Sequence, residues 1–371
     1  MGGEDAMDRE TLTPRQAVSI NVLFLFGSTA IMGVNAGVAQ DSWIAFLMGI
    51  AFAVPAVLVY ARLISLFPGK NLFEMAELLF GSILGKILSI LMIWYAIHLC
   101  ALVLKNFSEF LEICVMPETP ELTVIISMLL VICYMARSGL ETLGKWAIFA
   151  LPVVTIVVVL TIVFAVNRMD FDRILPIGVH NLGTIAVQGY KSFTFPFAES
   201  VLFLCAVGKL GKNGSPYKIY LYTIFVGGAI LTAILLRNVF LLGPKVVNSE
   251  YFPSYTAAKV INIANLITRM EGLIAINFIV AGIVKCAVCL FAACKGMAHL
   301  LEVRDYHQLV LPVGLLCAAL STNLFKSVAE MIEFTDVYMI YAIPFEILIP
   351  LVVWIAAERK RRRERKAAET P

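Results

Sequence analysis

The amino-acid sequence predicts an all-α, polytopic membrane protein with ten transmembrane helices. Hydrophobic residues make up 60% of the 371 residues and charged residues only 15%, whereas soluble domains are roughly 45–50% apolar and about 25% charged. The apolar residues occur in blocks of about 20, the length at which an α-helix crosses a hydrocarbon core of roughly 30 Å. No block alternates apolar and polar residues along its length, so a transmembrane β-barrel is disfavoured.

The apolar blocks, taken in order, set the boundaries of the expected spans. These spans cover residues 17–38, 43–66, 84–110, 121–136, 146–166, 183–207, 218–242, 273–299, 309–325 and 336–356. A short amphipathic helix is expected before the third span, because apolar residues follow helical spacing between 72 and 80. The chain is thus expected to comprise a cytoplasmic N-terminal arm (1–16), a ten-helix membrane domain (17–356) and a basic cytoplasmic tail (357–371).

The basic residues predict the orientation, because Lys and Arg in short loops mark the cytoplasmic side of a membrane. The tail has the densest group, which consists of Arg359, Lys360, Arg361, Arg362, Arg363, Arg365 and Lys366. An even number of spans places both ends of the chain on this side. The joints at 38–42 and 116–121 carry no basic residue, as expected of external joints. The basic run has no folded module beside it, which argues against a nucleic-acid partner. The run could serve only to orient the protein in the membrane, or it could also bind anionic lipid of the bilayer.

The N-terminal segment lacks the features of a cleaved signal peptide, so we expect the first span to be retained.

Most of the eight cysteines fall inside apolar spans, where Cys behaves as a small hydrophobe and implies no disulfide framework. Cys286 and Cys289 form a C-x-x-C pair, but no second pair or histidine cluster accompanies it. We therefore expect neither a metal site nor a cofactor.

Two of the expected spans contain residues that interrupt helices. The first span contains Gly27, Ser28, Thr29 and Gly33. The sixth span contains Phe193, Thr194, Phe195, Pro196 and Glu199. Proline removes an amide donor and clashes with the preceding turn, and small hydroxyl residues can satisfy backbone groups that such a break frees. Both helices are therefore expected to break near the middle of the membrane.

Breaks in spans 1 and 6 lie five spans apart, which fits two five-helix halves. Because five is odd, the second half would run inverted relative to the first. Transporters with such inverted repeats bind substrate at the paired breaks, where helix N-termini attract carboxylates and free carbonyls attract cations. Pro and Gly are, however, generally common in membrane helices, so the breaks alone leave both interpretations open.

Several short motifs resemble those of the spore germination receptor B-subunit permeases, the GerAB-type endospore germination proteins of the amino acid/polyamine/organocation superfamily. The motifs lie at residues 12–16 (LTPRQ), 40–43 (QDSW), 67–74 (FPGKNLFE), 136–141 (ARSGLE) and 195–199 (FPFAE), with Lys285 in span 8. The resemblance covers nearly the whole chain. Two departures stand out, because this family commonly has glycine where Thr29 and Ala198 stand, and their loss stiffens both breaks slightly.

The resemblance implies a LeuT-like fold, with five-plus-five inverted repeats and broken helices 1 and 6. It also implies a multi-pass protein of the spore inner membrane, with a central pocket for a small nutrient such as an amino acid. The expected partners are the A and C subunits of a germination receptor. The first functional hypothesis is therefore a receptor subunit that binds a germinant and triggers germination. The alternative is a proton- or sodium-coupled amino-acid transporter, and no acid/base pair or nucleophile motif suggests an enzyme.

Ionisable residues at membrane depth cost about 2.5–3.5 kcal/mol on insertion scales and are functional candidates by default. Lys285, Glu199 and Glu346 lie within spans 8, 6 and 10. Lys285 has two open interpretations. It could replace the coupling cation that related transporters hold between spans 1 and 8, or it could form a structural ion pair with a glutamate.

The third span contains further candidates. Tyr95 and His98 are one turn apart and could face the pocket, although a lone His on an apolar helix is more often a core residue. Lys105 and Glu109 are expected to pair along the helix. Arg237, near the outer end of span 7, is expected to extend its charge to the interface.

Overall fold

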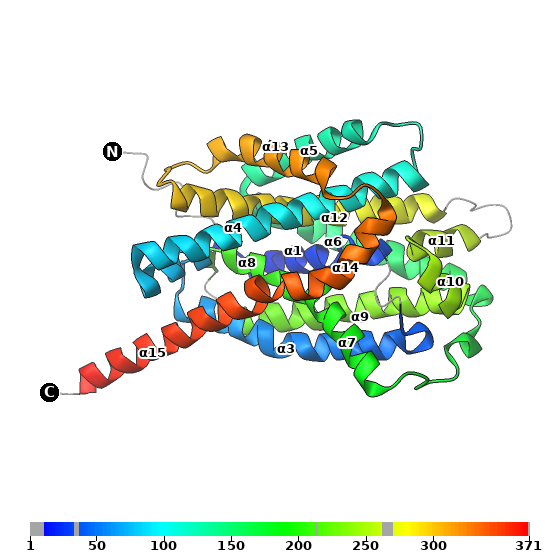
Figure 1. The fold of residues 1–371 in the computed structure, drawn as a ribbon, viewed down its shortest axis with the longest axis horizontal. Coiled ribbons are helices and arrows are strands. Elements are labelled where there is room, and N and C mark those ends of the chain that lie inside the picture. The colour runs from blue at the N-terminus through cyan, green and yellow to red at the C-terminus, as the bar shows by residue number, and fades with distance from the viewer. Residues whose placement is uncertain (1–10, 33–36, 212–213, 262–269, 370–371) are drawn as a thin grey trace.

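The computed structural model describes residues 11–32, 37–211, 214–261 and 270–369, and these are almost entirely helical (Figure 1). The helices are α1 (Pro14–Phe26), α2 (Thr29–Met32), α3 (Ser42–Leu66), α4 (Leu72–Cys114), α5 (Glu121–Arg137), α6 (Gly139–Ala165), α7 (Leu182–Ser192), α8 (Val201–Ala206), α9 (Pro216–Leu242), α10 (Pro244–Ser249), α11 (Pro253–Val260), α12 (Met270–Leu300), α13 (His307–Leu324), α14 (Val328–Tyr341) and α15 (Ile349–Glu369). Single-turn segments lie at Ala39–Asp41, Val166–Arg168, Phe171–Ile174, Phe193–Phe197, Ala198–Ser200 and Pro344–Leu348.

Seven helical stretches of the described chain are long and apolar enough to cross a membrane. They are Ser42–Leu66, Leu72–Cys114, Gly139–Arg168, Pro216–Leu242, Met270–Leu300, His307–Leu324 and Val328–Ala367. The expected spans 1, 4 and 6 are not among them, because α5 has only 17 residues and the other two spans are divided into short pieces. The chain is a multi-pass membrane protein.

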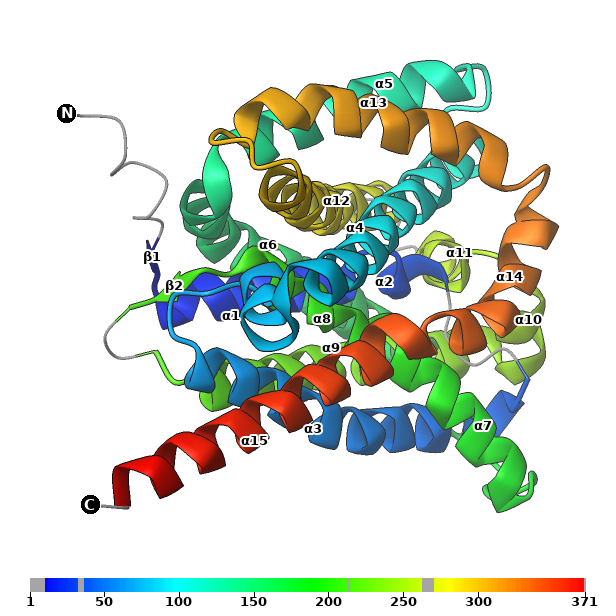
Figure 2. The same ribbon diagram turned by 60° about the vertical axis from the view of Figure 1, so that its left-hand side comes forward.

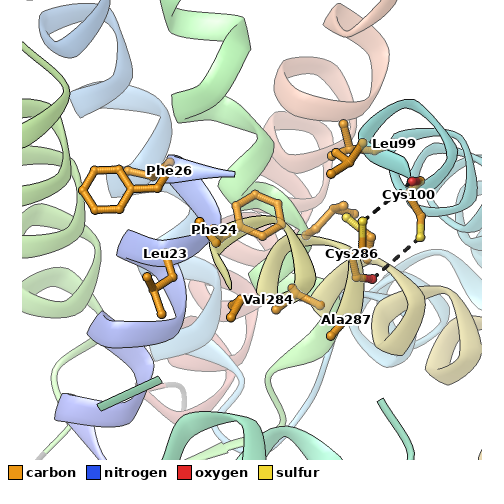
Figure 3. Close-up of a cluster of buried hydrophobic side chains, with 14 of the residues drawn as sticks. Leu23, Phe24, Phe26, Leu99, Cys100, Val284, Cys286 and Ala287 are labelled. Atoms are coloured by element: carbon orange, nitrogen blue, oxygen red, sulfur yellow. Dashed lines mark hydrogen bonds between the residues drawn. The ribbon is translucent and has the colours of Figure 1, made fainter. Parts of the chain in front are cut away.

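The core of the bundle forms where α1, α4 and α12 meet (Figures 1 and 3). Leu23 and Phe24 on α1 lie beside Val284 on α12, and all three side chains are fully or almost fully buried. On the other face of α12, Cys286 and Cys100 of α4 exchange thiol-to-carbonyl hydrogen bonds at 3.7 and 3.9 Å. The α5 and α13 helices cover one side of this core, and α3, α7 and α9 cover another.

The first expected span is interrupted at Gly27. Its first part, α1, begins with a capping box in which Thr13 and Gln16 satisfy each other's backbone amides. The helix ends at Phe26, Gly27 has non-helical dihedral angles (φ 11°, ψ −118°), and α2 follows at Thr29. The interruption thus lies at the glycine that the sequence indicated.

The sixth expected span is interrupted next to Pro196. The α7 helix ends at Ser192, and α8 begins only at Val201. Between them Phe195 has extended dihedral angles (φ −126°, ψ 109°), as expected of a residue before proline. The family that the sequence resembles has glycine at the position of Ala198, and the alanine does not prevent the break.

The last expected span differs most from the prediction. It was expected to run unbroken over 336–356, but its helix begins earlier, at Val328, where Ser327 caps the first turn. A π-helical segment, Pro344–Leu348, then separates α14 from α15. Proline cannot donate the backbone hydrogen bond that a regular helix requires, and the widened turn places Glu346 inside the protein.

The two ends of the described chain lie at the same end of the bundle (Figure 2). Thr11–Leu12 pairs in parallel with Lys209–Leu210 to form β1 and β2. The tail continues α15 to Glu369 as one helix. The expected amphipathic helix also occurs, as the segment Leu72–Phe80 of α4, and positive-φ Gly81 separates it from the rest of that helix.

Candidate functional site

A cavity of about 430 Å³ lies between α4, the break in the sixth span, α10 and α14. Its wall is largely apolar. The polar residues that line it include Asn106, Gln188, Lys191, Glu199, Glu250, Glu333, Asp336 and Tyr338. Its volume is within the range typical of sites for small molecules.

Glu199 and Lys285 form a salt bridge next to this cavity, and both side chains are completely buried. Glu199 comes from the single turn that follows Pro196, and Lys285 comes from the middle of α12. The Lys285 ammonium also lies 5.2 Å from the ring centre of Phe24 and 5.0 Å from that of Phe195, which is within cation–π range. The lysine therefore connects α12 to both interrupted helices.

A chain of hydrogen bonds continues from Glu199 into the bundle. The Tyr338 hydroxyl is 2.9 Å from Glu199 Oε1 and 2.9 Å from the Tyr95 hydroxyl. The Tyr95 hydroxyl is in turn 2.6 Å from Glu346 Oε1. The second oxygen of Glu346 has no hydrogen-bond partner among the described residues. Four buried side chains from four different elements thus form one polar network.

The number of protons in this network fixes the charge of one carboxyl group. Three oxygen–oxygen contacts join Glu199, Tyr338, Tyr95 and Glu346, and each needs one proton. The two tyrosine hydroxyls supply two, so the third must come from a carboxylic acid. Glu199 has the Lys285 ammonium beside it, whereas Glu346 has no cation. Since an unpaired buried charge is costly, we expect Glu346 to be the group that carries the proton.

The structure gathers only some of the predicted site residues at the cavity. Phe195 and Glu199 line it directly. Gly27 lies against the Lys285 side chain, and Tyr95 reaches the cavity through Tyr338. Ser28 accepts a hydrogen bond of 3.0 Å from the cavity residue Asn106.

The remaining predicted site residues do not line the cavity. Phe193, Thr194 and Pro196 are buried around the break itself, where the Thr194 hydroxyl donates to backbone carbonyls of its own segment. Thr29 is buried, and its hydroxyl has no hydrogen-bond partner in the part of the chain that the structure describes. Gly33 lies outside the described residues.

His98 packs within an aromatic group and not at the cavity. Its ring stacks on Trp94 with 5.5 Å between the ring centres, and it meets Tyr341 and Phe334 edge-on. Its Nδ1 has no hydrogen-bond partner. The ring therefore acts as a packing element in the described structure.

Tyr338, Asn106 and Lys191 are among the residues of the site that were not predicted from the sequence. Nothing in the sequence marks Tyr338 or Asn106 as a functional candidate, because a tyrosine or asparagine in an apolar helix carries no charge that requires a partner. Lys191 forms a salt bridge with Asp336 across the cavity wall, between α7 and α14. Among the described residues, no group of three or more His, Cys, Asp or Glu could hold a metal ion.

The predictions for Lys105 and for Arg237 had different outcomes. Lys105 pairs with Glu109 at 2.8 Å, as predicted, and also with Glu121 at 2.7 Å. The prediction for Arg237 was wrong, because its side chain is only 2% exposed and does not extend to the interface. It is retained inside by hydrogen bonds to Thr161 and Asn238.

Asp41, within the 40–43 motif, connects α3 to the segment before α7. Its carboxylate accepts hydrogen bonds from the backbone amides of Gly178 (2.7 Å) and His180 (3.0 Å) and contacts the His180 ring. Burial raises the pKa of Asp41, but these hydrogen bonds outweigh it and hold the pKa below its usual value.

Broken helices around a buried polar centre, within a bundle of apolar helices, define a membrane protein with a transporter-like fold. Solved structures agree on the fold. A mutant of the manganese transporter of Eremococcus coleocola superposes with a TM-score of 0.64 at 12% identity, covering 91% of this chain and 77% of the transporter. MhsT in complex with L-phenylalanine gives a TM-score of 0.60 at 10% identity, covering 92% of this chain and 87% of MhsT.

The family is shown by sequence. The family model described as "Spore germination protein" matches residues 11–324. Spore germination protein KB of Bacillus subtilis (strain 168) is 24% identical over 371 residues, which cover 98% of this chain and 99% of that protein. The chain belongs to the spore germination permeases of GerAB type and is a multi-pass protein of the spore inner membrane.

Proposed function

We propose that this protein is the membrane subunit of a germinant receptor and binds an amino acid in the 430 Å³ cavity beside Glu199. The observation that carries the proposal is the position of this cavity. It adjoins the break of the sixth span through Phe195 and Glu199, and it reaches the break of the first span through the Asn106–Ser28 hydrogen bond. Paired breaks are where transporters of this fold class bind substrate.

The charges around the cavity favour a ligand with an ammonium group. Among the described residues, four acidic residues line it, Glu199, Glu250, Glu333 and Asp336, together with the basic residue Lys191. Lys285 and Lys191 pair with Glu199 and Asp336, which leaves Glu250 and Glu333 without a salt bridge among the described residues. Such an excess of carboxylates attracts cations. The α-ammonium group of an amino acid would meet this acidic wall, and the Asn106 amide and the backbone near Ser28 would face its carboxylate.

We assign the membrane domain to residues 17–356 and propose for it ten spans in two inverted halves. Interruptions at Gly27 and Pro196 support this arrangement, because they fall at equivalent positions of the first and sixth expected spans. Residues 1–16 and 357–371 would form the cytoplasmic arm and tail.

Lys285 would make the site independent of a coupling cation. Its ammonium group lies between the two breaks, where it neutralises Glu199 and contacts the rings of Phe24 and Phe195. A fixed positive charge in this position would replace a bound sodium ion. A purely structural ion pair is the competing role, and the two roles predict different behaviour of Glu199 variants, as described in the Discussion.

The second candidate function is transport of the amino acid, which the transporter fold favours. Receptor and transporter differ in flux. We expect the purified chain in proteoliposomes to bind amino acid without concentrating it, because signalling would pass to the A and C subunits. Concentrative uptake by this chain alone, driven by a proton or sodium gradient, would favour the transporter.

A further inference from the structure

Arg237 is a buried cation without a counter-ion in the described structure. It lies near the end of α9, and its side chain is 2% exposed. No carboxylate of the described residues forms a salt bridge with it, and its hydrogen-bond partners are the neutral side chains of Thr161 and Asn238. Burying an unpaired charge is costly, so we expect a negative charge close to the guanidinium group of Arg237.

The guanidinium group also has unused donors. It carries five N–H groups, and its hydrogen bonds use three of them, two to Asn238 Oδ1 and one to Thr161 Oγ1 (2.7 Å). Two N–H groups therefore have no acceptor among the described residues. Buried donors of this kind are normally satisfied by water or by an anion.

A small cavity is lined in part by Arg237. Its volume is about 20 Å³, and its polar lining consists of Thr161, Arg237, Ser254 and Asn277. The Thr161, Ser254 and Asn277 side chains already donate to the backbone carbonyls of Val158, Ala30 and Val154, respectively. The volume leaves room for a single small species.

We propose that this cavity is a binding site for a monatomic anion, chloride under physiological conditions, held by the guanidinium group of Arg237. A halide ion matches the size of the cavity, accepts hydrogen bonds from both unused N–H groups and supplies the missing negative charge. Water would satisfy the donors but would leave the charge unpaired.

The site is connected to the outer part of the first span. Asn238, which holds the guanidinium group, donates a 3.0 Å hydrogen bond to Ser254 on α11, and Ser254 donates to the carbonyl of Ala30 on α2. The chain of contacts therefore joins α9, α11 and α2. An anion bound at Arg237 would fix these three elements relative to one another.

Two measurements on the purified full chain test the proposal. The first is the thermal unfolding temperature at constant ionic strength as chloride replaces gluconate, which is too large for the cavity. We expect the wild type to gain at least about 2 °C. Arg237→Met should show no dependence on chloride, and Lys145→Met, which removes an exposed charge on α6, should behave like the wild type.

The second measurement is anomalous diffraction from crystals of the wild type grown in bromide. A bromide peak in contact with the guanidinium group of Arg237 is the expected result. If Arg237→Met does not fold, Arg237→Lys should still respond to chloride, at higher concentration. Equal unfolding temperatures of the wild type in chloride and gluconate, with only water density beside Arg237, would overturn the proposal.

Discussion

The side chain of Lys285 occupies the space that a Cβ atom on Gly27 would need. An ideal Cβ built at Gly27 would lie 2.3 Å from Lys285 Cδ, a distance at which one of the two must move. Gly27→Ala should therefore displace the lysine and weaken its salt bridge with Glu199. We expect at least a tenfold loss of amino-acid affinity, about 1.4 kcal/mol, with normal insertion into the membrane.

The control for this prediction is Gly272→Ala in α12, where an added Cβ would have no neighbour within 4 Å. Equilibrium binding of radiolabelled amino acid to both purified variants makes the comparison. Unchanged binding by Gly27→Ala would show that the ligand does not depend on the position of Lys285.

Lys285→Met should strongly destabilise the protein, because it leaves the Glu199 carboxylate buried and unpaired. Breaking a buried ion pair in this way costs about 3–5 kcal/mol. Lys285→Arg should restore only part of the stability, since the planar guanidinium group is larger and has a different hydrogen-bond geometry. Thermal unfolding of the three proteins, with and without sodium, measures the effect, and the wild type should not require sodium.

The double variant Lys285→Met/Glu199→Gln separates the two roles of the pair. Removing both charges should recover most of the stability, because no unpaired charge remains. If the pair is only structural, amino-acid binding returns with stability. If Lys285 instead replaces a coupling cation, as proposed, the double variant folds but does not bind, because the fixed positive charge between the two breaks is missing.

Glu346 should be a neutral carboxylic acid at pH 7. Its contacts lead to this expectation, since Tyr95 and Tyr338 cannot supply all the protons that the hydrogen-bonded network needs. Infrared spectroscopy of the purified protein should show the carbonyl band of a protonated carboxyl group. The band should disappear in Glu346→Gln and persist in Glu199→Gln. A band lost only in Glu199→Gln would place the proton on the other carboxyl group.

Asp41→Asn should destabilise the contact between the start of α3 and the segment before α7 in a pH-dependent manner. The folded-state pKa of Asp41 is below its unfolded value, which is about 3.9. The charged carboxylate therefore contributes stability above about pH 4, and that contribution disappears as the pH falls through the folded-state pKa. We expect a loss of about 1.5–3 kcal/mol at pH 7 that shrinks near pH 3. An equal loss at both pH values in thermal unfolding would contradict the assignment.

The breaks at Gly27 and Pro196 could be predicted because they arise from backbone chemistry that the residue types themselves reveal. Lys285 could be recognised as a candidate for a similar reason, since a lone charge in an apolar block must have a partner. The identity of that partner could not be predicted from the sequence. Glu199 lies 86 positions away in the chain, and only the packing of α12 against the sixth span brings the two together.

Other parts of the site depend on tertiary structure alone. Tyr338 was missed because its importance comes from its place between Glu199 and Tyr95. The start of α14 was misjudged, because the charged residues Glu330 and Glu333 interrupt an otherwise apolar region and the last span was expected to begin only at residue 336. In the structure, helix α14 instead presents Glu333 and Asp336 to the cavity.

The most direct test of the proposed function is a binding screen with the twenty standard amino acids and the purified chain. Each is added to the wild type and to Glu199→Gln, and the thermal unfolding temperature is recorded. We predict that at least one amino acid stabilises the wild type in a saturable manner and that Glu199→Gln loses this response. A wild type that responds to none of them, or a Glu199→Gln variant that responds equally, would contradict an amino-acid site at this cavity.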